Sequence, residues 1–171
     1  MVLRMELATF AHQLWGVCGQ APEKLRLEQE EDVLGVVEAE SRTLLEVFSA
    51  SMLPDVGWTP YEQALLLDGN DGRGIDVGLM TRGGHRVTEI RTHIADTDRA
   101  GVIFSRDCPE YHVRTPGGER LVVLVNHFKS KGYGSAGDPI GAQRRFRQAA
   151  RLAQIYADLV YEGARYVAVV G

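Results

Sequence analysis

The sequence has few cysteines and no long apolar run, and both absences narrow the class of protein. Its two cysteines, Cys18 and Cys108, stand far apart. They form no metal-binding or redox spacing and imply no disulfide framework, which fits a reducing compartment. No apolar run reaches the ~20 residues that a membrane-spanning helix needs. We therefore expect neither a disulfide-stabilised domain nor a membrane span.

The sequence also lacks an export signal and any sign of subdivision. Met1–Phe10 contains the acidic Glu6 and no long apolar segment, so we expect no signal peptide and, by default, a cytoplasmic protein. No internal repeat, low-complexity segment or linker is present. Hydrophobic residues make up 44% and charged residues 25% of the 171 positions, as in one folded domain covering 1–171.

Charge is distributed unevenly along the chain. Residues 1–68 hold 4 Lys/Arg and 12 Asp/Glu, whereas residues 69–171 hold 15 and 11. A basic region beside an acidic one would suit a polyanionic substrate that meets a metal held by carboxylates. The alternative is a solvated helix face. Most of the basic excess comes from Lys129, Lys131, Arg144, Arg145, Arg147 and Arg151.

The hydrophobic pattern predicts strands interspersed with helices, which is typical of a layered α/β or α+β domain. The predicted strands are Met5–Phe10, Val33–Val37, Ala64–Leu67, Ile75–Thr81, Val87–Ile94, Tyr111–Arg114, Leu121–Val125 and Tyr166–Val170. The predicted helices are Pro22–Glu31, a helix capped by Ser41 that continues to Met52, and Ala142–Glu162.

Glycine-rich segments predict the turns and exclude one fold. Gly83 and Gly84 predict a hairpin between the strands on either side, and 116–118 predicts another. The segments 95–101 and 131–140 are expected to be loops. Gly69–Gly74 precedes a strand rather than a helix and lacks the dinucleotide-binding spacing, which argues against a doubly wound nucleotide-binding fold.

Polar residues follow two of the predicted buried strands. Glu38 ends the first, where a carboxylate can serve as an oxygen ligand for Mg²⁺. The alternative is that Glu38 and Glu40 are first-turn acids of the next helix. His127 and Lys129 follow the second strand, where they could donate to a phosphate and stabilise developing charge. The alternative is a structural histidine beside solvated lysines.

Taken in order, several segments resemble the endonuclease/exonuclease/phosphatase superfamily, which has the deoxyribonuclease-I-like fold. LGVVEAE is similar to its xGxxEVE segment, RGIDVGLM to RGIDVGLL, FSRD to its FSRD turn, NHFKSK to NHLKSK and the helix from Gln143 to its RxxQA helix. The resemblance extends over most of the chain. It implies an α+β fold, a four-layer α/β/β/α sandwich that is incomplete at the C-terminus.

The resemblance also implies a function and a set of site residues. It implies a metal-dependent phosphodiester hydrolase, most simply a nuclease, using Mg²⁺ (or Mn²⁺) and acting on nucleic acid or another phosphodiester. Glu38 would hold the metal and His127 would contact the scissile phosphate, the two meeting from the tips of neighbouring strands. Asn126, Lys129 and Arg73 would bind substrate. Asp76 would orient a neighbour, and His93 and Arg106 would be structural.

Two departures limit this reading. Ala11 stands where the family has a metal-site Asn, and the chain ends before the family's GDFN segment, whose Asp activates water. We therefore expect this chain alone to be inactive and to form oligomers or to pair with a complementing chain. The alternatives are a non-catalytic phosphate or nucleic-acid binding module derived from such an enzyme, or an incomplete gene product.

Overall fold

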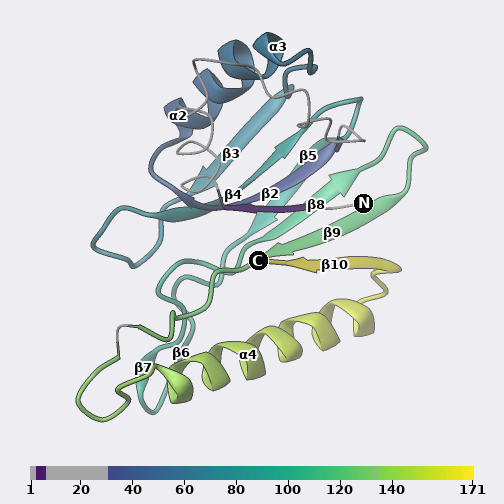
Figure 1. The fold of residues 1–171 in the computed structure, drawn as a ribbon. Coiled ribbons are helices and arrows are strands. Elements are labelled where there is room, and N and C mark those ends of the chain that lie inside the picture. The colour runs from purple at the N-terminus through teal and green to yellow at the C-terminus, as the bar shows by residue number, and fades with distance from the viewer. Residues whose placement is uncertain (1–2, 7–30, 133) are drawn as a thin grey trace.

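The computed structural model describes residues 3–6, 31–132 and 134–171. They form a mixed α/β structure with two four-stranded sheets (Figure 1). The predicted helix from Pro22, most of the first predicted strand, and Ala11 lie outside these residues. The first sheet has the order β1 (Leu3–Glu6), β2 (Val33–Ala39), β4 (Asp76–Thr81), β3 (Gln63–Leu67). The second has the order β10 (Tyr166–Val170), β9 (Arg120–Val125), β8 (Glu110–Arg114), β5 (Arg86–Arg91).

Two helical segments accompany the sheets. The first runs through α2 (Arg42–Val47), the π-helical η1 (Phe48–Met52) and α3 (Leu53–Asp55). Its predicted cap is confirmed, because the hydroxyl of Ser41 accepts a hydrogen bond from the Leu44 N–H at 3.2 Å. The second is α4 (Ala142–Tyr161). No helix in the described part of the chain combines the length and apolar character needed to cross a membrane.

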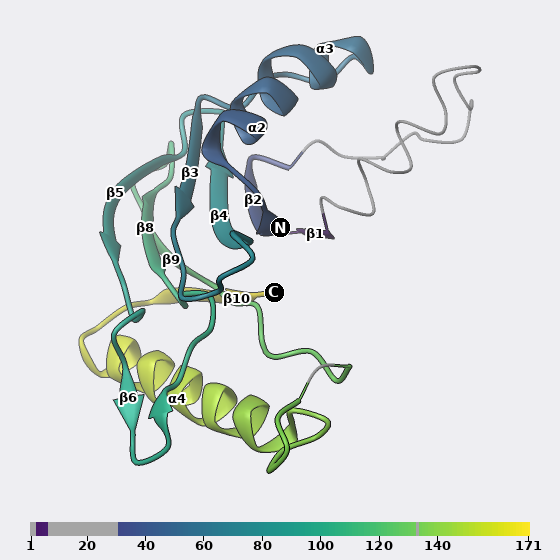
Figure 2. The same ribbon diagram turned by 90° about the vertical axis from the view of Figure 1, so that its left-hand side faces the viewer.

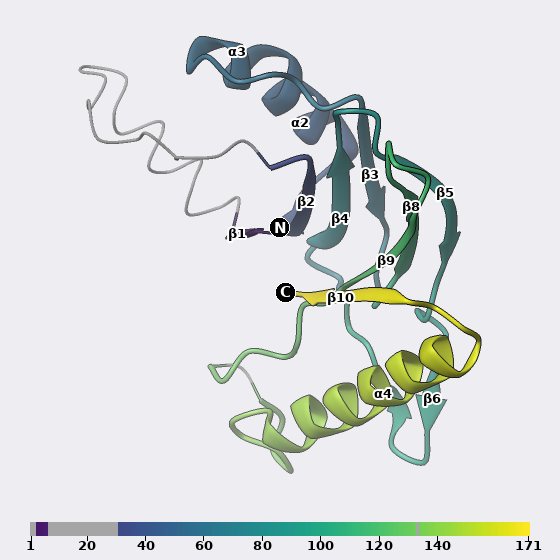
Figure 3. The ribbon, with the colours of Figure 1, turned by 90° about the vertical axis from the view of Figure 1, so that its right-hand side faces the viewer.

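Alternation along the strands sends apolar side chains to both faces of each sheet, giving three buried clusters. The first lies between α2–η1 and the first sheet and includes Leu34, Val36, Leu45, Phe48 and Met80. The second lies between the sheets and includes Val33, Val37, Leu79, Tyr111, Val123 and Val125. The third lies between the second sheet and α4 and includes Val122, Leu124, Ile155 and Leu159. Figures 2 and 3 show the helices on opposite sides of the sheets.

Gly35 allows the two sheets to approach closely near the functional residues. A Cβ atom at this position would lie 2.8 Å from the Cγ2 atom of Val170 on β10. Only glycine fits that spacing without displacing β10. The close approach brings the end of β2, which carries Glu38, beside the end of β9.

The predicted hairpin at Gly83–Gly84 is wrong, although both glycines turn the chain with positive φ. Strand β4 pairs with β2 on one side and β3 on the other, so it has no free edge for β5. Strand β5 instead pairs with β8 in the second sheet. The predicted hairpin between β8 and β9 is confirmed. The predicted loop 95–101 contains most of a short hairpin formed by β6 (Thr97–Asp98) and β7 (Gly101–Val102).

Candidate functional site

Glu38 occupies a bulge at the end of β2. Val37 pairs with Val77 and Ala39 with Asp76, so Glu38 is an extra residue between two paired neighbours. It is the one non-glycine residue with positive φ (58°) in the described part of the chain, a conformation that costs about 1–2 kcal/mol. Such strain concentrates at functional sites. Its side chain remains 34% exposed.

His127 meets Glu38 across the gap between the sheets. The Nε2 atom of His127 lies 3.7 Å from the Oε1 atom of Glu38. Strands β2 and β9 belong to different sheets and contact each other face to face, so these neighbouring strands are not hydrogen-bonded to each other. The two residues nevertheless share one place. Close packing of the sheets through Gly35 brings them together where strand pairing does not.

Asn126 fixes the strand end that carries His127. Its side-chain amide donates to the Val170 carbonyl at 2.6 Å, and its backbone N–H donates to the same oxygen at 2.9 Å. Asn126 is buried. Its amide N–H is therefore engaged with the backbone of β10, which gives Asn126 a positioning role, and its expected contact with substrate stays a prediction.

Arg106 extends the site from the turn before β8. Its side chain is 3% exposed, with Nη2 at 4.0 Å from Glu38 Oε1 and Nε at 3.5 Å from Asp71 Oδ2. Desolvation lowers the pKa of its guanidinium. Sequence reasoning assigned Arg106 a structural role, yet it lines the site. The backbone at Gly69 packs closely against this arginine, because a Cβ there would lie 2.8 Å from the Arg106 Cα atom.

Asp71 holds a second arginine. Arg73 donates to both of its carboxylate oxygens, from Nε at 3.0 Å and Nη2 at 2.8 Å. The hydrogen bond from Arg73 holds the pKa of the Asp71 carboxyl well below its usual range. Asp71 thus stays ionised between Arg73 and Arg106. It fixes two guanidinium groups on one side of the site.

Asp76 orients the same loop without facing substrate. This residue is buried and accepts a hydrogen bond from the Gly69 N–H at 2.7 Å. Burial raises the pKa of its carboxyl. The geometry agrees with the expectation that Asp76 orients a neighbour. His93 similarly has two carboxylate partners, Asp96 and Glu110, which fits the structural role expected of it.

A pocket of about 550 Å³ opens beside Arg106. Four of its lining residues are cationic and one is a carboxylate, Asp71. Burial, followed by the charges of Arg106, Arg73 and Arg144, lowers the pKa of Lys129. Cations that crowd one another in this way favour a bound anion. The lining residues are Asn70, Asp71, Gly72, Arg73, Ser105, Arg106, Lys129 and Arg144.

A metal could be held here only by a small number of protein ligands. Residues 31–132 and 134–171 contain no group of three or more His, Cys, Asp or Glu placed to hold a metal ion. Glu38 offers one carboxylate next to His127. Mg²⁺ commonly uses one or two carboxylates and keeps several waters, so Glu38 fits as a single protein ligand.

No family model matches the chain, and neither a curated protein nor a solved structure matches it. The likeness to the endonuclease/exonuclease/phosphatase superfamily is thus confined to short sequence segments. The features of the molecule that point to a function are Glu38, His127 and the cationic pocket beside them.

Proposed function

We propose that the chain is a Mg²⁺- or Mn²⁺-dependent phosphodiester hydrolase acting on nucleic acid. The observation that carries the proposal is the 3.7 Å approach of His127 to Glu38 beside a pocket with four cationic residues. A carboxylate, an imidazole and several guanidinium groups are what metal-assisted phosphoryl chemistry requires. The three buried clusters, in the order helix, sheet, sheet, helix, support the four-layer sandwich as its fold.

Each residue has a role in this proposal. A metal ion bound through Glu38 would supply positive charge at the phosphate and its leaving oxygen. His127 donates a hydrogen bond to a non-bridging oxygen as negative charge grows. Arg106, fixed by burial between Glu38 and Asp71, stabilises the same charge without reorganising. Asn126 keeps His127 in place through β10.

The pocket favours a polymer over a small diester. Its volume of about 550 Å³ and its four cations are more than one phosphate group needs. Arg73 and Lys129 lie on its lining, where they would contact a phosphate next to the scissile one. Nucleic acid supplies such neighbouring phosphates at regular spacing. This is the support for nucleic acid as the substrate.

The second candidate is a phosphate or nucleic-acid binding module without catalysis. Two carboxylates near the pocket are already engaged, Asp71 by Arg73 and Asp76 by Gly69. Neither is available to activate water. We therefore expect the chain to bind nucleic acid more readily than it hydrolyses it.

Labelled single- and double-stranded DNA can test the proposal by anisotropy and by cleavage with Mg²⁺. Lys129→Gln should weaken binding about fivefold and reduce the salt slope by about 1, since one phosphate contact is lost. The exposed Arg86→Gln, outside the pocket, should change neither quantity. Glu38→Ala should remove any Mg²⁺-dependent cleavage.

The outcomes separate the two candidates. Cleavage that depends on Glu38 supports the hydrolase, and Lys129-dependent binding without cleavage supports the binding module. Equal effects of Lys129→Gln and Arg86→Gln would show that this pocket does not bind DNA. Cleavage that survives Glu38→Ala would show that Glu38 does not hold the metal.

A further inference from the structure

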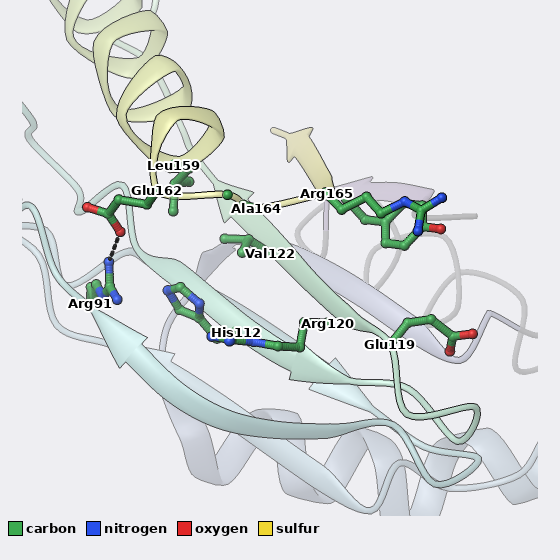
Figure 4. A pocket seen from close by; sticks show the side chains of 11 residues that line it. Arg91, His112, Glu119, Arg120, Val122, Leu159, Glu162, Ala164 and Arg165 are labelled. Carbon is green, nitrogen blue, oxygen red and sulfur yellow. Dashed lines mark hydrogen bonds and ion pairs between the residues drawn. The ribbon is translucent and has the colours of Figure 1, made fainter.

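A second pocket, of about 440 Å³, lies at the other end of α4 (Figure 4). Its floor comes from β5, β8 and β9, and its walls come from the end of α4 and the start of β10. Arg144, in the first turn of α4, lines the pocket beside Arg106, whereas Leu159, in its last turns, lines this one. A 20-residue helix is about 30 Å long, so the two pockets are separate.

A buried carboxylate fixes the histidine on the floor of this second pocket. His112 and Glu110 lie two residues apart on one face of β8, with His112 Nε2 at 3.1 Å from Glu110 Oε2. The side chains are 9% and 6% exposed. The other Glu110 oxygen lies 2.9 Å from His93 Nε2. Glu110 is therefore held from both sides and keeps the ring of His112 in one orientation.

The hydrogen bond to Glu110 decides which nitrogen of His112 faces a ligand. Because a carboxylate accepts, Nε2 carries the hydrogen, and Nδ1 is left to bind something else. Residues 31–132 and 134–171 supply no hydrogen-bond partner for Nδ1. Figure 4 shows the ring rising from the floor toward the wall formed by α4.

The cations around the second pocket are neutralised at one end and not at the other. Arg91 pairs with Glu89 at 2.8 Å and with Glu162 at 3.0 Å. Arg120 and Arg165 are exposed, and no carboxylate of the described residues lies within ion-pair distance of either. Glu119 also lines the pocket beside Arg120, so the two arginines exceed the carboxylates by one positive charge at the end away from Glu162.

The wall of the second pocket is partly apolar. Val122 and Leu159 are buried members of the cluster under α4, and Ala164 packs against the same cluster. Arg165 lies over the ring of Tyr166 at 5.4 Å from its centroid, which presents a flat surface beside a charge. This combination suits a ligand with a flat apolar part and one charged end.

We propose that this pocket binds a small organic oxyanion, a carboxylate or phosphate group on a flat apolar body. The anion lies toward Arg120 and Arg165, because Glu162 and the C-terminal end of α4 repel it from the opposite end. His112 takes up a proton from solvent at Nδ1 on binding and donates it as a hydrogen bond. The charged groups around His112 are Glu110, Glu89, Arg91 and Arg120 from the sheet, Glu119 from the turn before β9, Glu162 from the end of α4 and Arg165 from the segment before β10.

Four probes separate the parts of this ligand: benzoate, phenyl phosphate, inorganic phosphate and uncharged benzamide. Each is titrated into the full chain while the imidazole resonances of His112 are followed by NMR, assigned with His112→Gln. Benzoate and phenyl phosphate should shift them saturably, with dissociation constants on the order of 1 mM. Inorganic phosphate should bind at least tenfold more weakly. Benzamide should give no saturable shift.

Variants and proton counting complete the test. Arg120→Gln/Arg165→Gln should weaken benzoate binding at least tenfold, whereas the matched control Arg86→Gln/Arg99→Gln should leave it unchanged. Calorimetry in two buffers of different ionisation enthalpy should show proton uptake that His112→Gln removes. Equal binding of benzamide and benzoate, equal effects of the two double variants, or no proton uptake would each overturn the proposal, whatever is found at Glu38.

Discussion

The two ends of α4 carry the same kinds of residue with different electrostatic environments. Beside its first turn, four cations share one pocket with the carboxylate of Asp71. Beside its last turn, Arg91 is neutralised by Glu89 and Glu162, and the leftover charges, Arg120 and Arg165, are exposed to solvent. At the first end, loops bring together cationic residues that are far apart in the sequence, namely Arg73, Arg106 and Lys129. At the second end the charges are more widely exposed, and among the described residues only Arg91 of the three arginines has carboxylate partners within ion-pair distance.

The comparison indicates where removing a charge matters for stability. Arg106 is 3% exposed and faces both Glu38 and Asp71, so its loss removes a buried positive charge from two carboxylates, of which Asp71 keeps its hydrogen bonds from Arg73. Arg120 is exposed to solvent, so its loss leaves no buried charge without a partner. Exposure and partner count, rather than residue type, therefore rank the effects expected from substitution.

The largest expected effect is that of Arg106→Gln. We expect it to lower the free energy of unfolding by about 3 kcal/mol, because a buried cation is removed from two acids. Arg120→Gln, the matched change at the other end of α4, should cost less than about 0.5 kcal/mol. Urea unfolding followed by circular dichroism measures both.

If Arg106→Gln lowers the free energy of unfolding by less than about 1 kcal/mol, the two ends of α4 do not differ in the way described. Such a small loss would mean that water or a rearranged loop already solvates Glu38 and Asp71. Arg106→Lys separates charge from shape, because lysine keeps the charge and loses the planar fork. It should recover part of the stability and little of the DNA affinity.

Much of the fold could be predicted from the sequence because its strands are short apolar runs bounded by polar turns. Val33–Val37 and Tyr166–Val170 are predicted strands that the structure confirms. Local pattern does not say which strands pair, and so the hairpin at Gly83–Gly84 was wrong. That outcome depends on β4 being paired on both sides, which is a property of the whole sheet.

The candidate site was predictable in residue type and not in arrangement. Glu38 and His127 stand out as polar residues after apolar strands, and the structure places them 3.7 Å apart. The bulge with φ of 58° at Glu38 could not be predicted from the sequence, since glutamate has no preference for that conformation. Arg106 was missed because its burial depends on contacts with Gly69 and Asp71, both distant in sequence.

The next largest effect is a pH-dependent change in stability, which compares Asp71 at the first pocket with Glu162 at the second. Because the pKa of Asp71 lies well below its usual range, the folded state keeps this carboxylate ionised at pH values where the unfolded chain protonates it. Its stabilising contribution is present above about pH 4, the ordinary aspartate pKa, and is lost as the pH falls further. Asp71→Asn should cost about 1 kcal/mol at pH 7, a modest value because Arg73 is solvent-exposed.

The pH dependence of the Asp71→Asn effect distinguishes loss of the carboxylate charge from a packing defect. The stability difference between wild type and Asp71→Asn should shrink as the pH falls from 5 to 2. Glu162→Gln, in an exposed ion pair with Arg91, should cost less than about 0.5 kcal/mol at neutral pH. Urea titrations at several pH values give both curves, and a pH-independent cost for Asp71→Asn would contradict the role of its charge.

The smallest effect is expected away from both pockets' linings, at Tyr111 on β8. Its side chain is fully buried between the sheets, burial raises the pKa of its hydroxyl, and that oxygen has no hydrogen-bond partner among the described residues. Tyr111→Phe removes an unsatisfied polar atom and keeps the ring, so stability should be unchanged or rise by up to about 1 kcal/mol. Thermal and urea unfolding measure it, with Val113→Ala as a control that should destabilise by about 1–3 kcal/mol. A loss above 1 kcal/mol for Tyr111→Phe would mean that a buried water satisfies the hydroxyl, and the core between the two sheets would then contain a polar site.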